Sequence, residues 1–308
     1  MNTMRWSEPG ASHDDTGPPT IKNHSVTHFQ GNLYCFGGYD GRRNHMTLLL
    51  YSIQDQLWIP TRQTTPSSSS SMDSDMNPAP LPPHHLHHHH HRHHHHHHHH
   101  HHHRHLAAAS LRRASPSASG HDAAYGLVVS GTPPPGRNGH TATLATDPED
   151  EDHGRIIIIG GWLGSGPLAA SDMHVLDVSP TLGLRWYQPT VKGTPPGPCN
   201  MHTADFFSNQ REVYVFRGGN GREYLNDLHA LHVDTYTWRR VETNGATPQQ
   251  RANHSSALLE ETGELFIFGG WYVYLLLLQW RVVSLTLSLS LSLTLSHGCC
   301  IAGMAVNG

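Results

Sequence analysis

This chain of 308 residues has little of what marks secreted, disulfide-bonded or nucleic-acid-binding proteins. It contains only four cysteines, and none shows the spacing of a zinc site or a disulfide framework. Charged residues make up 14% of the sequence and the net charge is −4, so there is no basic field to attract nucleic acid. The opening segment MNTMRWSEPGASHDD lacks the apolar core of a secretory signal, so we expect a cytoplasmic or nuclear location.

Glycine pairs are the most informative feature that is present. Four short apolar runs each end in such a pair: Gly37 and Gly38, Gly160 and Gly161, Gly218 and Gly219, Gly269 and Gly270. A tryptophan follows the first three pairs at similar distances: Trp58, Trp186 and Trp238. Gly218 and Gly269 are 51 positions apart, and repetition at a fixed period indicates one supersecondary unit used several times.

Each unit has the residues of a four-stranded antiparallel sheet. Val213–Phe216 and Leu265–Phe268 are short runs rich in β-forming residues, as expected for strands covered on both faces. The glycine pairs would end these strands, where the backbone turns sharply. Asn226-Asp227 and Ser171-Asp172 would bond the backbone of the next turn. The tryptophans would lie on the outer strand and fill space between sheets.

On these residues the sequence resembles the kelch repeat family. Residues 194–271 follow its pattern of His-Ser, apolar strand, Gly-Gly, Asn-Asp, Leu-rich strand and Trp, whereas 131–190 and 20–60 follow it less closely. In the first copy Met46-Thr47 stands where Asn-Asp is usual. The resemblance implies an all-β fold, a kelch-type β-propeller of radially arranged sheets called blades. We expect a partial propeller of three to four blades, a fragment of a larger ring.

The expected organisation has four parts. Residues 1–60 would hold the first kelch repeat, beginning inside a blade at Trp6, and 125–271 the others. Residues 61–124, rich in Ser, Pro and His, would form a disordered insert, since they cannot bury enough apolar surface. The histidine run fits an expanded codon repeat that binds divalent metals only incidentally.

Residues 272–308 depart from the repeat. Their Leu-Ser alternation fits translated non-coding DNA. Alternatively, residues 271–295 could anchor the chain in a membrane, although Gln279 and Arg281 oppose this.

For function, the resemblance implies a scaffold or adaptor that binds a protein partner through propeller loops. The candidate partner-binding residues follow the glycine pairs: Tyr39, Asp40, Arg42, Arg43, Trp162, Ser165, Asn220, Arg222, Glu223 and Tyr224. Aromatic and arginine side chains often dominate binding energy at interfaces.

The alternative is a metal-dependent kelch-fold enzyme, either an oxidase or an iron-containing specifier protein. Specifier proteins on this fold resemble one another in an iron pattern of Glu-x-x-x-Asp-x-x-x-His. Glu223 and Asp227 match its first two positions, but His232 lies one residue beyond the third. In a strand, a shift of one residue turns the side chain to the opposite face. His140, His202 and His254 recur at one repeat position, which favours structural roles. We therefore expect no catalytic residue, cofactor or metal ligand.

Overall fold

The computed structural model describes residues 19–64, 126–168, 170, 172–271 and 282–286, and regular structure there is β-strand apart from one 3₁₀ turn, Ser208–Gln210. The poly-His run and Cys299-Cys300 lie outside this part of the chain. No helix among the described residues is long and apolar enough to cross a bilayer. The possible anchor over 271–295 lies mostly outside them.

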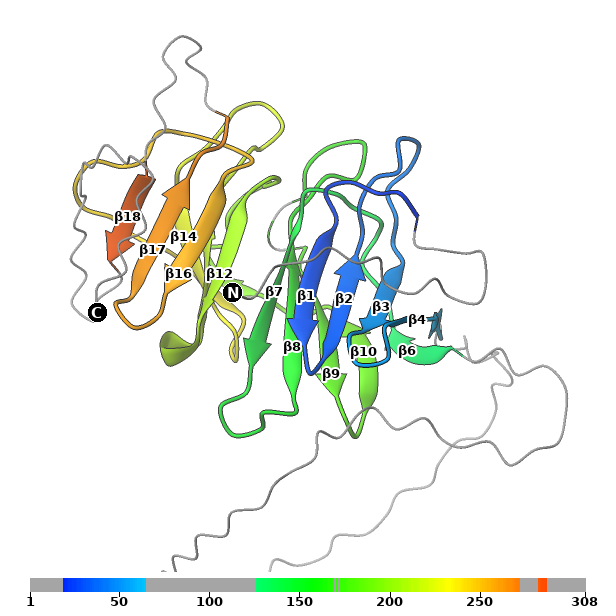
Figure 1. Cartoon of the computed structure of the whole chain (residues 1–308). Coiled ribbons are helices and arrows are strands. Elements are labelled where there is room, and N and C mark those ends of the chain that lie inside the picture. Colours follow the sequence, from blue (N-terminus) through cyan, green and yellow to red (C-terminus); the bar gives the residue numbers. More distant parts are fainter. Residues whose placement is uncertain (1–18, 65–125, 169, 171, 272–281, 287–308) are drawn as a thin grey trace, which may run out of the picture. The chain divides into compact units, whose positions relative to one another are not determined.

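The strands form four sheets, which we number as blades 1 to 4 (Figure 1). Blade 1 runs outward through β1 (Ser25–Phe29), β2 (Asn32–Phe36), β3 (Leu48–Ser52) and β4 (Leu57–Ile59). Blade 2 repeats this with β7 (Thr141–Thr146), β8 (Gly154–Ile159), β9 (His174–Ser179) and β10 (Gly183–Tyr187). Blade 3 uses β12 (Thr203–Phe207), β13 (Glu212–Phe216), β14 (Leu228–His232) and β15 (Thr237–Arg240).

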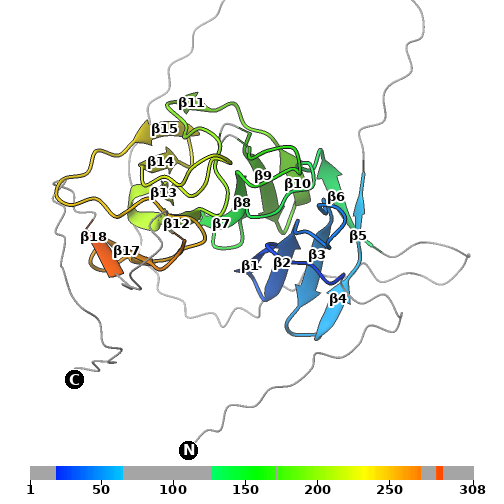
Figure 2. The same cartoon turned by 90° about the horizontal axis from the view of Figure 1, so that it is seen from above.

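The innermost strands of consecutive blades pack against one another, β1 on β7, β7 on β12 and β12 on β16. The four sheets thus form a partial kelch-type propeller, as the repeat predicts. Figure 2 shows the strands of blade 3 succeeding one another outward from β12 to β15.

Blades 2 and 3 carry extra outer strands that the sequence does not reveal. β6 (Leu127–Gly131) pairs in parallel with β10, and β11 (Lys192–Gly193) pairs in parallel with β15. β5 (Thr61–Gln63) then pairs with β6. The insert expected from residue 61 therefore begins later, because Thr61–Gln63 is held by backbone pairing to a strand beyond the insert.

Blade 4 contains β16 (Ser255–Leu259), β17 (Glu264–Phe268) and β18 (Val282–Thr286). β18 comes from the segment that departs from the repeat, and it pairs with β17 along the open hydrogen-bonding edge of that strand. Burial in β17 also differs from expectation. Leu265 and Ile267 are buried but Phe268 is 44% exposed, so this strand is covered on one face only.

Apolar packing between blades explains the repeated tryptophans. Trp186 and Trp238 lie on the fourth strands, as expected, and each is buried against the preceding blade. Trp186, for instance, has its ring centroid 5.3 Å from that of Phe36. Trp58 is half-buried and contacts Tyr51 of its own blade, with ring centroids 5.2 Å apart. Each fourth-strand Trp therefore needs a preceding blade to become buried.

The repeated histidines also join blades. Their imidazole Nε2 atoms hydrogen-bond to the hydroxyl that opens the inner strand of the preceding blade. The pairs are Ser25 to His140 at 2.9 Å, Thr141 to His202 at 3.0 Å and Thr203 to His254 at 3.1 Å. Burial lowers the pKa of these histidines, to about 3 for His140 and His202 and about 4 for His254. Neutral imidazoles thus hold the blades together, and the expected structural role is what the geometry supports.

A row of backbone hydrogen bonds runs beside these histidines. Gly139 N–H donates to Asn23 C=O, Met201 N–H to Gly139 C=O, and Asn253 N–H to Met201 C=O, at 2.8–2.9 Å. All four residues have positive φ, between 53° and 64°. Three of them are not glycine, so they adopt a conformation that L-residues ordinarily avoid. The tertiary structure imposes it, because it aims each N–H at the preceding blade.

Candidate functional site

The loops that join the second and third strands of blades 1 to 3 lie at equivalent positions. We refer to the surface formed together by these three loops, residues 39–44, 162–167 and 219–224, as the loop end. Each loop is closed by a bridge between its first and last residues. Each is also fixed by a backbone bond to a glycine, from His45 to Gly38, Leu168 to Gly161 and Leu225 to Gly218, at 2.8–3.0 Å. The candidate residues therefore do fall on equivalent loops.

The third glycine pair is out of register with the others by one residue. Gly218, not Gly219, takes the place of Gly38 and Gly161, and neither Gly218 nor Gly219 has positive φ. Gly219 takes the place of Tyr39 and Trp162, as their shared bridging pattern shows. The assumption of four pairs in register is therefore wrong for blade 3, where Arg217 stands at the first glycine position.

Arg217 has a structural reason for being there. In blade 2 the fully buried Arg137 donates to Asp172 Oδ2 at 3.4 Å and to Gly160 C=O at 3.1 Å. In blade 3 Cys199 occupies the position equivalent to Arg137 and has no guanidinium. Arg217 supplies one instead, with a nitrogen 3.1 Å from Asp227 Oδ2.

The two aspartates thus pair with arginines, which corrects the expectation that they bond the turn backbone. Asp172 also accepts from Gln188 at 3.0 Å and Asp227 contacts His229 at 2.9 Å. Asn226 donates to Pro248 C=O at 2.8 Å. Ser171 lies outside the described residues.

Two of the candidate residues build their own loops. Asp40 Oδ1 accepts the N–H groups of Arg42 and Arg43 at 2.7 and 2.8 Å. These bonds, with a contact from His45, hold the pKa of Asp40 well below its ordinary value. Asn220 Oδ1 likewise accepts the N–H groups of Arg222 and Glu223, both at 2.9 Å. Asp40 and Asn220 therefore shape the loops, and their side chains are already engaged.

Neighbouring loops also contact one another. Asn44 Nδ2 donates to Trp162 C=O at 2.9 Å, and its Oδ1 accepts from Asn138 at 2.8 Å. On the other side, a Cβ placed on Gly221 would lie 3.0 Å from Pro167 and 3.4 Å from the Trp162 ring. Glycine at this position therefore lets the third loop approach the second, and Trp162 lies between its two neighbours.

The remaining candidate side chains divide by exposure. Five are exposed: Arg42, Arg43, Ser165, Arg222 and Glu223. Three aromatic residues are half-buried: Tyr39, Trp162 and Tyr224. The loop end thus presents three exposed arginines beside aromatic rings that are partly held in place.

Two further residues, which the repeat pattern does not predict as binding residues, extend this surface. Lys22 places Nζ 5.8 Å from the centroid of the Tyr39 ring, within cation–π reach. Trp271 pairs with Ala252 through two backbone bonds and is 59% exposed. It occupies in blade 4 the position of Tyr39 and Trp162. Its place directly after Gly270 was the signal that could have identified it.

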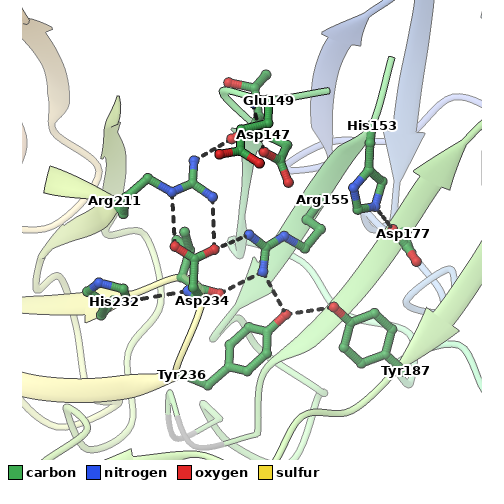
Figure 3. A network of polar contacts seen from close by, with 12 residues as sticks. Asp147, Glu149, His153, Arg155, Asp177, Tyr187, Arg211, His232, Asp234 and Tyr236 are labelled. Carbon is green, nitrogen blue, oxygen red and sulfur yellow. Dashed lines mark hydrogen bonds and ion pairs between the residues drawn. The ribbon is translucent and has the colours of Figure 1, made fainter. Parts of the chain in front are cut away.

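The seam between blades 2 and 3 holds a polar network (Figure 3). Asp234 accepts two hydrogen bonds from Arg211, at 2.8 and 3.0 Å, and one from Arg155 of blade 2. Arg155 also reaches Tyr236, whose hydroxyl lies 2.6 Å from that of Tyr187. Because Asp234 is bonded by an arginine from each of the two blades, we assign the network to inter-blade cohesion.

The enzyme alternative finds no support in the described part of the chain. No group of three or more His, Cys, Asp or Glu side chains there could hold a metal ion. Cys35 and Cys199 are free and buried, and burial raises the pKa of Cys199 to about 12. A thiol held so fully protonated is a poor nucleophile. Asp227, part of the suggested iron spacing, is paired with Arg217.

Comparison with known proteins gives a consistent result. Residues 151–279 match the family model described as the KLHDC2/KLHL20/DRC7 Kelch-repeats domain. The Rab9 effector protein with kelch motifs of Xenopus laevis is 33% identical over 149 residues, covering 47% of this chain and 38% of that protein. Kelch domain-containing protein 1 of Mus musculus is 37% identical over 102 residues, or 32% of this chain and 24% of that protein.

An enzyme also appears among the relatives. Serine/threonine-protein phosphatase BSL2 of Arabidopsis thaliana is 32% identical over 146 residues, covering 47% of this chain but 13% of the phosphatase. The chain thus spans well under half the length of these relatives, and a shared kelch segment does not by itself imply the activity of the longer protein.

Proposed function

Because the chain is a kelch-repeat protein, we propose that it acts as an interaction module that binds a protein partner through the loop end. The observation that carries the proposal is that exposed arginines stand on the first and third loops, and that both loops contact the second loop, which holds Trp162. The general kind of function fits the relatives, one of which is named as an effector of Rab9.

The chemistry of the loop end supports this role. The three arginines are exposed, while the loops beneath them are fixed by Asp40, Asn220 and the bonds of Asn44. A surface of cationic side chains on a rigid base loses little backbone entropy on binding. Partly buried aromatic rings add apolar area beside the charges, as at many interface hot spots.

The test compares two triple-alanine variants in affinity capture with quantitative mass spectrometry. The first is R42A/R43A/R222A. The matched control removes the same charge from exposed arginines on outer strands, R62A/R185A/R240A. We expect the loop-end variant to lose most of the specific partner signal and the control to keep it.

Retention of every partner by the loop-end variant would overturn the proposal. Equal loss in both variants would also overturn it, because binding would then follow total charge and not this surface. Thermal melting of both proteins confirms that each is folded.

A further inference from the structure

The two terminal blades expose faces that their counterparts bury. The fifth residue of each inner strand lies on the face turned toward the following blade. Phe29, Ala145 and Phe207 occupy this position in blades 1 to 3 and are 6%, 1% and 5% exposed. Leu259 occupies it in blade 4 and is 45% exposed. Blade 4 thus carries an apolar face of the kind that elsewhere receives another blade.

Blade 1 exposes the complementary face. Val26 stands where Ala142 and Ala204 pack against the preceding blade, and it is 52% exposed. Leu33 is half-buried, whereas its equivalents Ile156 and Val213 are buried completely or nearly so. This side of blade 1 is therefore a surface suited to docking on a preceding blade.

Polar groups on the two faces also match. The hydroxyl of each blade bonds the histidine of the next, and Ser255 on blade 4 and exposed His24 on blade 1 hold these two positions. The row of backbone bonds begins at Asn23 and, within the described residues, ends at Asn253. In this row each N–H donates to the C=O of the preceding blade. The row therefore ends with the C=O of Asn253, an acceptor, on blade 4 and begins with the N–H of Asn23, a donor, on blade 1. The end faces are thus two halves of an interface that the chain already makes three times.

We propose that a second copy of this chain docks head to tail, with blade 4 of one copy packed on blade 1 of the other. Asn23 N–H would donate to Asn253 C=O across the contact, and His24 would meet Ser255. Two copies related by a two-fold axis form both contacts at once. They complete a ring of eight blades, within the range of four to eight that propellers use.

The experiment is sedimentation velocity on the full chain, with a chelator present so that metal ions cannot bridge histidines. We expect a species of twice the 34.2 kDa chain mass. Leu259→Arg and Val26→Arg each place a charge on one half of the contact, and both should give a species of single-chain mass. Leu182→Arg is the control, because Leu182 is 75% exposed in the turn between β9 and β10.

Mixing the two variants tests the polarity of the contact. The V26R chain keeps an intact blade 4 face and the L259R chain an intact blade 1 face. An equimolar mixture therefore restores one of the two contacts, while the other carries both arginines. A dimer should return in the mixture but dissociate at a higher protein concentration than the wild-type dimer. A wild-type chain of single mass overturns the proposal. So does a dimer that survives either substitution, or a mixture that dimerises no better than either variant alone. Because both side chains are exposed in the single copy, neither change needs to disturb folding, which circular dichroism checks.

Discussion

Acid should loosen the contacts between blades, and the three buried histidines that bond a hydroxyl of the preceding blade set the pH range. Each has a folded-state pKa below its ordinary value of 6.5, at about 3 for His140 and His202 and about 4 for His254. Below pH 6.5 these three histidines therefore bind protons in the unfolded chain but not in the folded chain. Stability is full above that pH and falls progressively as pH drops toward the folded values.

The size of the effect follows from linkage. At about pH 5 each histidine costs about 2 kcal/mol, because only its unfolded form is protonated. Three of them together cost about 6 kcal/mol, against a total stability of about 5–15 kcal/mol for an ordinary domain. The described kelch blades should therefore come close to unfolding at a pH at which many proteins are still stable.

The assay is urea unfolding followed by tryptophan fluorescence at about pH 7.5 and pH 5, for the wild type and His202→Gln. The variant should lose about 2 kcal/mol less than the wild type between these two pH values. His28→Gln, on an exposed side chain of β1, is the control and should behave as the wild type. The poly-His run is the same in all three proteins, so its protonation does not contribute to the differences between them. If His202→Gln shows the wild-type pH dependence, buried neutral imidazoles do not control acid stability.

Three further predictions concern packing and pairing, each measured by urea or thermal unfolding. Cys199→Arg should destabilise by more than about 2 kcal/mol, since it buries a second guanidinium near Asp227, and adding Arg217→Gly should recover most of the loss by restoring the blade 2 arrangement. A double variant no more stable than Cys199→Arg alone would refute the idea that Arg217 replaces an arginine at position 199. Trp238→Ala should cost about 3–5 kcal/mol and Trp58→Ala clearly less, because Trp238 is buried between blades and Trp58 is half-buried; equal losses would contradict the packing argument. Asp234→Asn should cost about 1–2 kcal/mol, a modest figure because the carboxylate is 41% exposed, and the loss should shrink in high salt. A salt-independent loss would show that charge is not what holds this seam.

Features that repeat locally could be predicted from the sequence, and non-local ones could not. The glycine pairs, His-Ser dipeptides and tryptophans predicted the sheets, because each unit folds by pairing strands adjacent in sequence. The shift at Arg217 was hidden because a glycine pair is still present there. β5 was missed because its partner lies beyond the insert, and no short-range pattern predicts such a pairing.

The candidate site was predictable to a similar degree. Its loops follow from the repeat, so Arg42 and Arg222 were placed correctly on equivalent turns. Asp40 and Asn220 each precede a glycine, a sequence typical of turn-building side chains, and could have been set apart from the binding residues. Contacts between loops, such as Trp162 with Gly221, depend on how blades pack and required the structure.

The pairing of β5 with β6 has a consequence for the order of folding. It joins Thr61 to Leu127, 66 positions apart, whereas the antiparallel hairpins of each blade close over short turns. A long connection must lose more chain entropy before its ends can meet, and contacts of high sequence separation form slowly. The blades therefore have time to assemble around their hairpins before β5 arrives. This strand should be the last to gain amide protection during refolding and the first to lose it when the native protein opens locally.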